Sequence, residues 1–397
     1  MADCARVVIK PGREKSLRHR HPWVFSGAIA RVEGEPAPGD TVAVVAHDGA
    51  PLAWAAWSPA SQIRARAWSF DPGARIDEDF LGARLAAAVA RRAGMLDEGH
   101  DACRLVHAES DGLPGLVVDR YGDTAVVQML SAGAERWRDF WPEAITRIAG
   151  SKAVYERSDA EVRALEGLAP RAGPLLGEVP GVVRMREAGL AYEVDVARGQ
   201  KTGFFLDQRD NRALASRVAK GCEVLNAFCY TGGFTVAALA GAARHVVSVD
   251  TSEEALALGR RNVQANGLNP ERAEWVAADV FAYLRKLRDQ GRRFGLVVLD
   301  PPKFAPTERH VEKAARAYKD INLWAMKLLA PGGRLLTFSC SGAIGPELFQ
   351  KIVAGAAADA RADLVVEGHL CASSDHPASL NFPEGEYLKG LALRSVA

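Results

Sequence analysis

Residues 223–235 read Glu-Val-Leu-Asn-Ala-Phe-Cys-Tyr-Thr-Gly-Gly-Phe-Thr, and this stretch decides the fold of the chain. The apolar run 224–228 predicts a buried strand, and the Ala-rich run 235–243 predicts a helix. Between them, Tyr230-Thr-Gly-Gly-Phe234 predicts a turn in which glycine lets a ligand approach the backbone closely. Because a helix N-terminus offers free N–H groups, this strand, turn and helix form a candidate ligand-binding unit.

The next apolar run, 245–250, ends in Asp250, 17 residues after Gly233. In dinucleotide-binding folds an acid about 20 residues beyond the glycine turn binds ribose hydroxyls. The dinucleotide pattern Gly-x-Gly-x-x-Gly is incomplete here, because the two glycines are adjacent and none follows three residues on. We therefore expect a nucleoside cofactor without a pyrophosphate, such as S-adenosylmethionine. A glycine turn without a ligand and a nicotinamide oxidoreductase are the alternatives.

The composition is that of a globular protein, with 48% hydrophobic and 25% charged residues among 397. This length predicts two or three domains. Fifty basic and forty-nine acidic residues leave a net charge of +1, so no global field indicates a polyanionic partner. The chain has no run of eighteen apolar residues and no signal-peptide pattern at its start, so we expect a cytoplasmic protein without a membrane partner. The six cysteines are scattered and form no Cys-x-x-Cys pair, which argues against a metal site.

Residues 6–70 alternate apolar and polar side chains in short runs broken by Pro-Gly and Asp-Gly turns, a pattern typical of a small β-barrel or sandwich. We place a first domain at 1–72. Its segment 6–31 holds seven Lys or Arg and one acid, interleaved with His21 and Trp23. Such a segment suits phosphate neutralisation and base stacking in RNA binding, and it also suits a solvated basic edge that protects a strand.

Residues 73–190 predict a small middle domain of α+β type. A helix is expected at 78–95, and another at 132–148 with Pro142 interrupting it. The expected strands lie at 104–106, 115–118, 124–129, 153–156 and 182–185, the second and third of them in a hairpin.

Residues 191–397 predict a third domain. After a run at 190–196, Asp207 can cap a helix, and strands then alternate with helices. Five strands are expected to end at Phe228, Asp250, Ala277, Leu299 and Phe338, and two late runs, 363–367 and 387–394, complete seven. This order predicts an α/β fold with a Rossmann-like, doubly wound parallel sheet, whose ligands bind at the carboxyl ends of the strands.

Polar side chains stand at or near the carboxyl ends of four of these strands: Asn226, Asp250, Asp279 and Asp300. Since those ends line one crevice in an open α/β sheet, we expect the four side chains to gather there. Each Asp taken alone is also an ordinary helix cap.

Two further stretches carry chemistry. In Asp300-Pro-Pro-Lys-Phe304 the prolines hold Asp300 rigidly at the strand end, and an exposed Phe304 could stack on a nucleobase; the alternative is a rigid turn. Cys340 lies between two serines where the chain leaves the sheet, which is a position for a nucleophile; its activation would need a lowered thiol pKa.

Five motifs together resemble the bacterial 23S ribosomal RNA cytosine-C5 methyltransferases of the RlmI type. They are Lys201-Thr-Gly-Phe-Phe-Leu-Asp-Gln-Arg209, Tyr230-Thr-Gly-Gly-Phe234, Asp300-Pro-Pro-Lys-Phe304, Phe338-Ser-Cys-Ser-Gly342 and Pro383-Glu-Gly-Glu-Tyr-Leu-Lys389. The stretches 10–16 and 21–27 are similar to that family's PUA domain, and 109–115 to its middle domain. One departure is Cys229, a second thiol beside the glycine turn.

The resemblance implies S-adenosylmethionine as cofactor and 23S ribosomal RNA as substrate, with Cys340 as nucleophile and Asp300 as the residue that recognises and protonates cytosine. Asp250 would bind the cofactor ribose and Asp279 the adenine amino group. The other cofactor-binding residues would be Phe204, Asp207, Gln208, Asn226, Phe228, Tyr230, Thr231, Gly232, Gly233, Ser252 and also Asp300. The candidate RNA-binding residues are Lys10, Arg13, Lys15, Arg18, Arg20, His21, Trp23, Lys303 and Phe304.

The implied chemistry needs a nucleophile because C5 of cytosine reacts poorly until a thiolate has added at C6. Two other functions stay open at this point. The chain could methylate a base nitrogen, for which Cys340 is incidental, or it could be a non-catalytic RNA-binding or ribosome-assembly protein. The oligomeric state is also open, a homodimer included.

Overall fold

The computed structural model describes residues 4–97, 99–305 and 308–396, which form two compact units. Unit 1 comprises Met1–Arg186, Val194–Phe204 and Asp375–Gly385. Unit 2 comprises Glu187–Glu193, Phe205–Ser374 and Glu386–Ala397. Both units are therefore built from segments that are far apart in the sequence.

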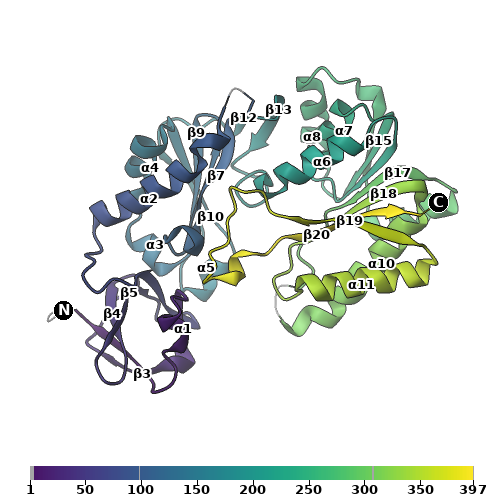
Figure 1. The fold of residues 1–397 in the computed structure, drawn as a ribbon. Coiled ribbons are helices and arrows are strands. Elements are labelled where there is room, and N and C mark those ends of the chain that lie inside the picture. Colours follow the sequence, from purple (N-terminus) through teal and green to yellow (C-terminus); the bar gives the residue numbers. More distant parts are fainter. Residues whose placement is uncertain (1–3, 98, 306–307, 397) are drawn as a thin grey trace. The chain divides into compact units, whose positions relative to one another are not determined.

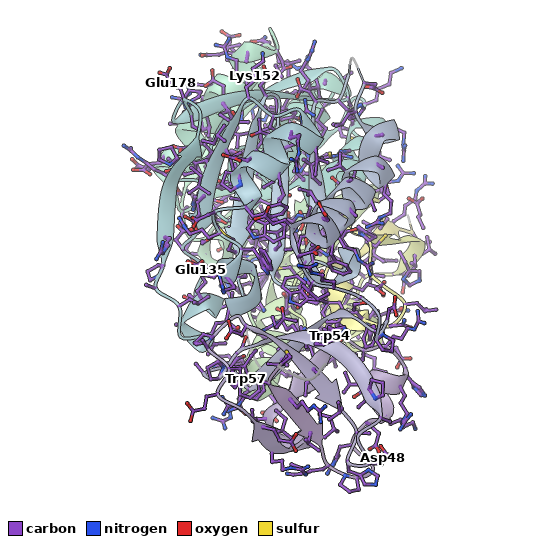
Figure 2. All side chains as sticks on the ribbon, turned by 90° about the vertical axis from the view of Figure 1, so that its left-hand side faces the viewer. Asp48, Trp54, Trp57, Glu135, Lys152 and Glu178 are labelled. Carbon is purple, nitrogen blue, oxygen red and sulfur yellow. The ribbon has the colours of Figure 1, made fainter. Side chains whose placement is uncertain are left out.

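The N-terminal part of unit 1 is a six-stranded sheet with the order β2-β6-β5-β4-β1-β3. Its β1 and β4 pair in parallel and the other neighbours pair antiparallel. Alternate residues such as Val42 and Val44 are fully buried in its core, and Figure 2 shows Trp54 and Trp57 on β5 and Asp48 in the turn before it. One of the short runs, residues 24–32, forms two strands, because a 3-10 turn at Ser26–Ala28 divides it. The strands are β1 (Arg6–Ile9), β2 (Trp23–Phe25), β3 (Ile29–Glu33), β4 (Thr41–Val45), β5 (Pro51–Trp57) and β6 (Ile63–Ser69); the short helix α1 (Lys15–Arg18) follows β1.

The second part of unit 1 is a five-stranded sheet with the order β11-β10-β9-β8-β7, packed against helices α2 (Glu78–Arg92) and α4 (Trp141–Ala149). The helix expected at 132–148 is two helices, α4 and the shorter α3 (Ala132–Arg136) before it. Pro142 lies in the first turn of α4, where a backbone N–H has no partner within the helix, so the missing N–H of proline costs no hydrogen bond. Sequence reasoning missed β11, whose Gly173 and Pro174 are tolerated because it is an edge strand. The strands are β7 (Ala102–His107), β8 (Leu116–Tyr121), β9 (Thr124–Met129), β10 (Ala153–Ser158) and β11 (Arg171–Leu176).

Buried ion pairs join the two parts of unit 1. Arg66, on β6, lies 2.7 Å from a carboxylate oxygen of Glu166 and 3.4 Å from one of Glu109, and all three side chains are at least nine-tenths buried. Glu109 also accepts a hydrogen bond of 2.8 Å from the indole of Trp23, and Ser58 donates one of 2.8 Å to Glu166. These carboxylates are stable in the interior because each has a cation or a donor beside it.

We expect Arg66→Met to lower the free energy of unfolding by about 3–5 kcal/mol, because it leaves two buried carboxylates without their cation. Denaturant titration followed by circular dichroism measures this change. The matched control is Arg75→Met, since the Arg75 side chain is 90% exposed and pairs with Asp77 at the surface. A loss below about 1 kcal/mol for Arg66→Met would show that the pair contributes no more than a surface ion pair.

Unit 2 is built on a seven-stranded sheet with the order β16-β15-β14-β17-β18-β20-β19. Helices α6, α7 and α8 cover one face of this sheet, and α9, α10 and α11 cover the other (Figure 1). The strands are β14 (Glu223–Ala227), β15 (His245–Asp250), β16 (Ala273–Ala277), β17 (Phe294–Leu299), β18 (Leu329–Ser339), β19 (Leu364–Cys371) and β20 (Lys389–Ser395). The helices are α6 (Arg209–Val218), α7 (Gly233–Ala240), α8 (Glu253–Ala265), α9 (Val280–Asp289), α10 (Val311–Lys327) and α11 (Pro346–Ala360); β12 (Val182–Glu187) and β13 (Leu190–Asp195) form a separate two-stranded sheet.

Two expectations about this domain need correction. The sheet is not wholly parallel, because β20 runs antiparallel to both β18 and β19, between which it is inserted. Asp207 does not cap α6: the helix begins at Arg209 with Gln208 as its N-cap and without a capping side chain. Asp207 lies instead in a 3-10 turn, Leu206–Gln208, where Tyr387 donates a hydrogen bond of 2.6 Å to its carboxylate.

Candidate active site

The loop between β14 and α7, residues 228–232, is called the glycine loop below, and its backbone is strained. Phe228 and Tyr230 have φ values of 60° and 47°, a left-handed conformation that costs energy for residues with a Cβ atom. Gly232, at φ 74°, tolerates this conformation, and a Cβ atom there would lie 2.5 Å from the ring of Trp275. Strain of this kind persists only where surrounding contacts hold it, and it is typical of ligand-binding loops.

Asp250 holds this loop in place. One of its carboxylate oxygens accepts a hydrogen bond of 2.9 Å from the Tyr230 backbone N–H, and the other accepts one of 3.0 Å from Ser252 N–H. Ser252 in turn caps α8 by accepting from Ala255 N–H. The carboxylate is therefore more than a helix cap, because it joins the ends of two neighbouring strands.

Two buried polar atoms beside the loop have no hydrogen-bond partner among the described residues. They are the side-chain oxygen of Asn226, on β14, and the hydroxyl of Thr231. The amide nitrogen of Asn226 is bound at 2.9 Å to the Thr235 hydroxyl, so the side chain is fixed with its oxygen available. Buried polar atoms are normally paired, and a polar nucleoside would pair them. The loop therefore fits S-adenosylmethionine.

Asp300 follows β17 and is held from a second segment. The side-chain amide of Gln208 donates a hydrogen bond of 2.9 Å to its carboxylate, and Asn211 donates one of 2.6 Å to the Gln208 amide oxygen. The same segment reaches the glycine loop, because the rings of Phe205 and Tyr230 meet edge to face with centroids 5.3 Å apart. Residues 205–211 thus connect Asp300 to the glycine loop.

Phe304 was expected to be exposed, and this is wrong. It is half-buried in an aromatic cluster, with its ring centroid 4.9 Å from that of Tyr318, 5.9 Å from Phe281 and 6.3 Å from Phe228. Burying a phenyl ring against a hydrophobic core is favourable in free energy compared with leaving it in water. Phe304 therefore packs against Phe228 of the glycine loop, while its neighbour Lys303 is exposed.

Two of the predicted cofactor residues lie in settings that do not require a ligand. Asp279 is exposed and caps α9 by accepting a hydrogen bond of 2.9 Å from Ala282 N–H. Phe204 is a buried residue of unit 1, where its backbone N–H lies 3.3 Å from the hydroxyl of Tyr121. Their contacts with the cofactor stay predictions.

Cys340 is half-buried at the carboxyl end of β18, directly after Ser339. The two serines beside it are both bound to the hydroxyl of Tyr318, on α10, at 3.0 Å for Ser339 and 3.1 Å for Ser341. Ser341 also accepts a hydrogen bond from Ala305 N–H, in the loop that carries Asp300. The flanking residues are thus anchored, and the backbone at Cys340 is held in position.

The second thiol near the loop has the wrong environment for a nucleophile. Cys229 is buried, and burial together with the neighbouring Asp250 carboxylate raises the pKa of its thiol well above the ordinary value. A thiol reacts as its thiolate, so a raised pKa suppresses its reactivity. The environment of Cys229 therefore favours Cys340 as the candidate nucleophile.

The candidate RNA-binding residues of unit 1 fall into two groups. Lys10, Arg13, Lys15, Arg18 and Arg20 are all exposed, on or near α1. His21 and Trp23 are instead engaged: the His21 ring lies 3.2 Å from the Glu384 carboxylate, and the Trp23 ring packs on Phe382 with centroids 4.8 Å apart. A cavity of about 620 Å³ opens beside them; its lining includes Arg20, Trp68, Phe70, Arg84, Arg91 and Phe382.

Sequence reasoning assigned no role to three residues that the structure brings to this site. Tyr387 and Lys389 belong to a motif that was recognised without a role for either, and both contact the site through hydrogen bonds to Asp207 and to the backbone after Cys340. Tyr318 carries no sequence signal, because an aromatic residue at helical spacing predicts only core packing.

In the described part of the chain, every helix falls short of the length and apolar character that a membrane span needs. Residues 4–97, 99–305 and 308–396 contain no group of three or more His, Cys, Asp or Glu side chains arranged to hold a metal ion.

The sheet order, the strained glycine loop and the carboxylate at the end of β15 define unit 2 as an S-adenosylmethionine-dependent methyltransferase, and the family model of that description matches residues 172–377. A PUA-like domain matches residues 7–70. Ribosomal RNA large subunit methyltransferase I of Shewanella denitrificans is 51% identical to this chain, covering 98% of it and 99% of the relative, and that of Cronobacter sakazakii is 50% identical with 98% of each covered. The chain belongs to this methyltransferase family.

A solved chain assigned as an S-adenosylmethionine-dependent methyltransferase from Streptococcus mutans has the same fold. Its TM-score is 0.84, with 98% of this chain and 99% of that chain covered at 21% identity. The predicted fold class is thereby confirmed, including the PUA-like N-terminal domain.

We expect Asp250→Ala to weaken S-adenosylmethionine binding by roughly 2 kcal/mol, a factor of about 30, because it removes a charged acceptor and frees the strained loop. Titration calorimetry measures the affinity. Asp250→Asn keeps an acceptor oxygen and is expected to lose less. The control is Asp289→Ala, at the exposed end of α9. An unchanged affinity for Asp250→Ala would show that the carboxylate serves only the backbone.

Proposed function

We propose that this chain methylates C5 of a cytosine in large-subunit ribosomal RNA, with Cys340 as the nucleophile and Asp300 as the residue that recognises the base. One observation carries the proposal. The carboxyl ends of β17 and β18 are adjacent, with Leu299 paired to Thr337, so Asp300 and the anchored Cys340 leave neighbouring strands on the same edge of the sheet. The names of the relatives supply the substrate class, ribosomal RNA of the large subunit.

Bound S-adenosylmethionine supplies an electrophilic methyl group, which C5 of cytosine is too poor a nucleophile to take unaided. The Cys340 thiolate adds to C6, so that an S–C6 bond forms and the electrons of the C5=C6 double bond move toward C5 and N3. C5 then has enamine character and takes the methyl group, while the electrons of the broken methyl–sulfur bond leave with S-adenosylhomocysteine. A base removes the C5 proton, and the electrons of that C–H bond re-form the C5=C6 double bond as the S–C6 bond breaks and the thiolate is released.

Asp300 has the position and the support for the base-recognition role. The charge that develops on cytosine during thiolate addition lies at N3 and O2, and a proton or strong hydrogen bond at N3 stabilises it. The hydrogen bond from Gln208 and the two prolines after Asp300 restrict its carboxylate, so little reorganisation is needed.

We further propose that residues 1–72 form the RNA-binding domain, 73–190 a linking domain and 191–397 the methyltransferase domain. The exposed cations on and near α1 neutralise phosphates, and the cavity beside them offers aromatic and arginine side chains to an unpaired nucleotide. Every residue assigned to catalysis comes from unit 2, so one copy of the chain suffices. A ribosomal RNA substrate supports a cytoplasmic location.

We expect Cys340→Ala to abolish turnover while leaving S-adenosylmethionine affinity nearly unchanged, because the thiolate acts on the base and not on the cofactor. With RNA containing 5-fluorocytosine, the wild-type protein should form a denaturant-stable complex, since fluorine cannot leave as a proton does. Gel electrophoresis and peptide mass spectrometry detect this complex. The control is Cys229→Ala, which should still form it.

Three results would contradict this assignment. Normal methylation of cytosine by Cys340→Ala would remove Cys340 as the nucleophile, and a trapped peptide containing Cys229 would replace it. A product identified as an N-methyl base would favour methylation of a base nitrogen, for which no covalent adduct is needed.

We expect the double variant Arg18→Ala, Arg20→Ala to weaken RNA binding and to reduce the salt slope of the affinity by about 1.4–1.8, because two phosphates lose their cations. Point substitutions are preferable to deleting residues 1–72, because deletion would unpair the carboxylates that Arg66 neutralises. The control is Arg147→Ala, an exposed arginine on α4. An unchanged affinity and slope would place RNA docking elsewhere.

A further inference from the structure

Lys389 is the first residue of β20, and the sheet places it beside the proposed nucleophile. Its Cα partner on β18 is Ser339, the residue that precedes Cys340, and its partner on β19 is Cys371. Only 8% of Lys389 is exposed. A lysine at this depth is unusual, because burial of an ammonium group away from water is costly unless something nearby compensates the charge.

The ammonium group is directed at the loop that follows Cys340. Its Nζ donates hydrogen bonds of 2.8 Å to the backbone carbonyls of Ser341 and Ile344. Within the described residues no carboxylate lies at ion-pair distance from this nitrogen, and carbonyl oxygens supply only partial charges. A thiolate at Cys340 would supply a full negative charge beside it.

The charged groups around Lys389 oppose one another. Burial lowers the pKa of Lys389 to about 8, the Cys340 thiolate and Glu386 raise it, and Lys303 lowers it. Tyr318, on α10, also faces Cys340; burial is the main cause that raises its pKa, so it stays neutral. Lys389 therefore keeps its proton through most of the neutral range, and ammonium and thiolate stabilise each other there.

We propose that the Lys389 ammonium stabilises the thiolate of Cys340 and so activates it for addition to the base. Lys389 is then a positioning residue that acts through Cys340, and this inference rests on the proposed function. The thiol S–H bond breaks with its electron pair left on sulfur, and the proton passes to solvent water. The N–H bonds of Lys389 are unchanged, and no further reactant is required.

A purely structural role for Lys389 makes a different prediction. If the side chain only ties two carbonyls together, a neutral donor of similar length should serve as well. The anchoring of Ser339 and Ser341 by Tyr318 already restrains the backbone at Cys340. Lys389→Gln, which keeps a donor without the charge, and Lys389→Arg, which keeps the charge, therefore separate the two roles.

The test is the pH dependence of iodoacetamide alkylation, followed at the Cys340 peptide by mass spectrometry in the full-length protein. In wild type the midpoint for Cys340 should lie below about 8.5, the ordinary value for a thiol. Lys389→Gln should raise this midpoint by about one pH unit, which lowers the thiolate fraction at pH 7 roughly tenfold. Lys389→Arg should restore most of the shift. Cys222, at the opposite end of the sheet, is the internal reference and should not change.

Catalysis gives a second readout that a structural role would not move. The kcat of Lys389→Gln should fall roughly tenfold at pH 7 and recover toward pH 9, with KM for RNA and S-adenosylmethionine affinity unchanged. Superposed alkylation profiles for wild type and Lys389→Gln would overturn the inference. A wild-type midpoint at or above the ordinary thiol value would also overturn it, even if both variants failed to fold.

The 5-fluorocytosine experiment separates this inference from the proposed function. If the wild-type protein forms the adduct while the alkylation midpoint of Cys340 is the same in wild type and Lys389→Gln, only the inference fails. If the midpoint shifts as expected but no adduct forms at Cys340, the electrostatic coupling holds and the proposed nucleophile fails.

Discussion

The hydrogen bonds of the Asp250 carboxylate are the contacts on which the methyltransferase unit depends. A single side chain accepts from Tyr230 N–H in the glycine loop and from Ser252 N–H at the start of α8. It thereby offsets the left-handed conformations of Phe228 and Tyr230, which an isolated chain would not adopt. The buried oxygens of Asn226 and Thr231 are then presented beside the loop, and they lie where a nucleoside would pair them.

The part of the site around Cys340 and Asp300 depends on a second constraint, the insertion of β20 between β18 and β19. Antiparallel pairing sets Lys389 opposite Ser339, and the segment before it brings Tyr387 to Asp207. Asp207 belongs to the same segment as Gln208, which holds Asp300. One strand of the sheet and one segment of the chain thus support both the proposed nucleophile and the proposed base-recognition residue.

Much of the molecule could be predicted because its periodicity is local. The alternating runs of residues 6–70, the helix at α2 and the strands β14, β15 and β17 follow from patterns a few residues long. The failures share a different cause. Strand β11 was missed because it contains Pro174, and proline is tolerated in a sheet mainly at an edge strand. Whether a strand lies at the edge is decided by the order of strands in the folded sheet. Phe304 was expected at the surface, beside the rigid Asp300-Pro-Pro turn, whereas its ring packs on residues from three other segments.

The sequence by itself determined the fold class, the cofactor class and the candidates Asp250, Asp300 and Cys340, because glycine turns, strand ends and motif spacing are written in consecutive residues. Only the tertiary structure distinguished the environments of the two thiols. Cys229 and Cys340 both follow apolar strands, but burial beside Asp250 suppresses ionisation of the first, and Tyr318 and Lys389 surround the second. A thiol pKa depends on charges and burial contributed by residues distant in sequence, and only folding brings those residues together.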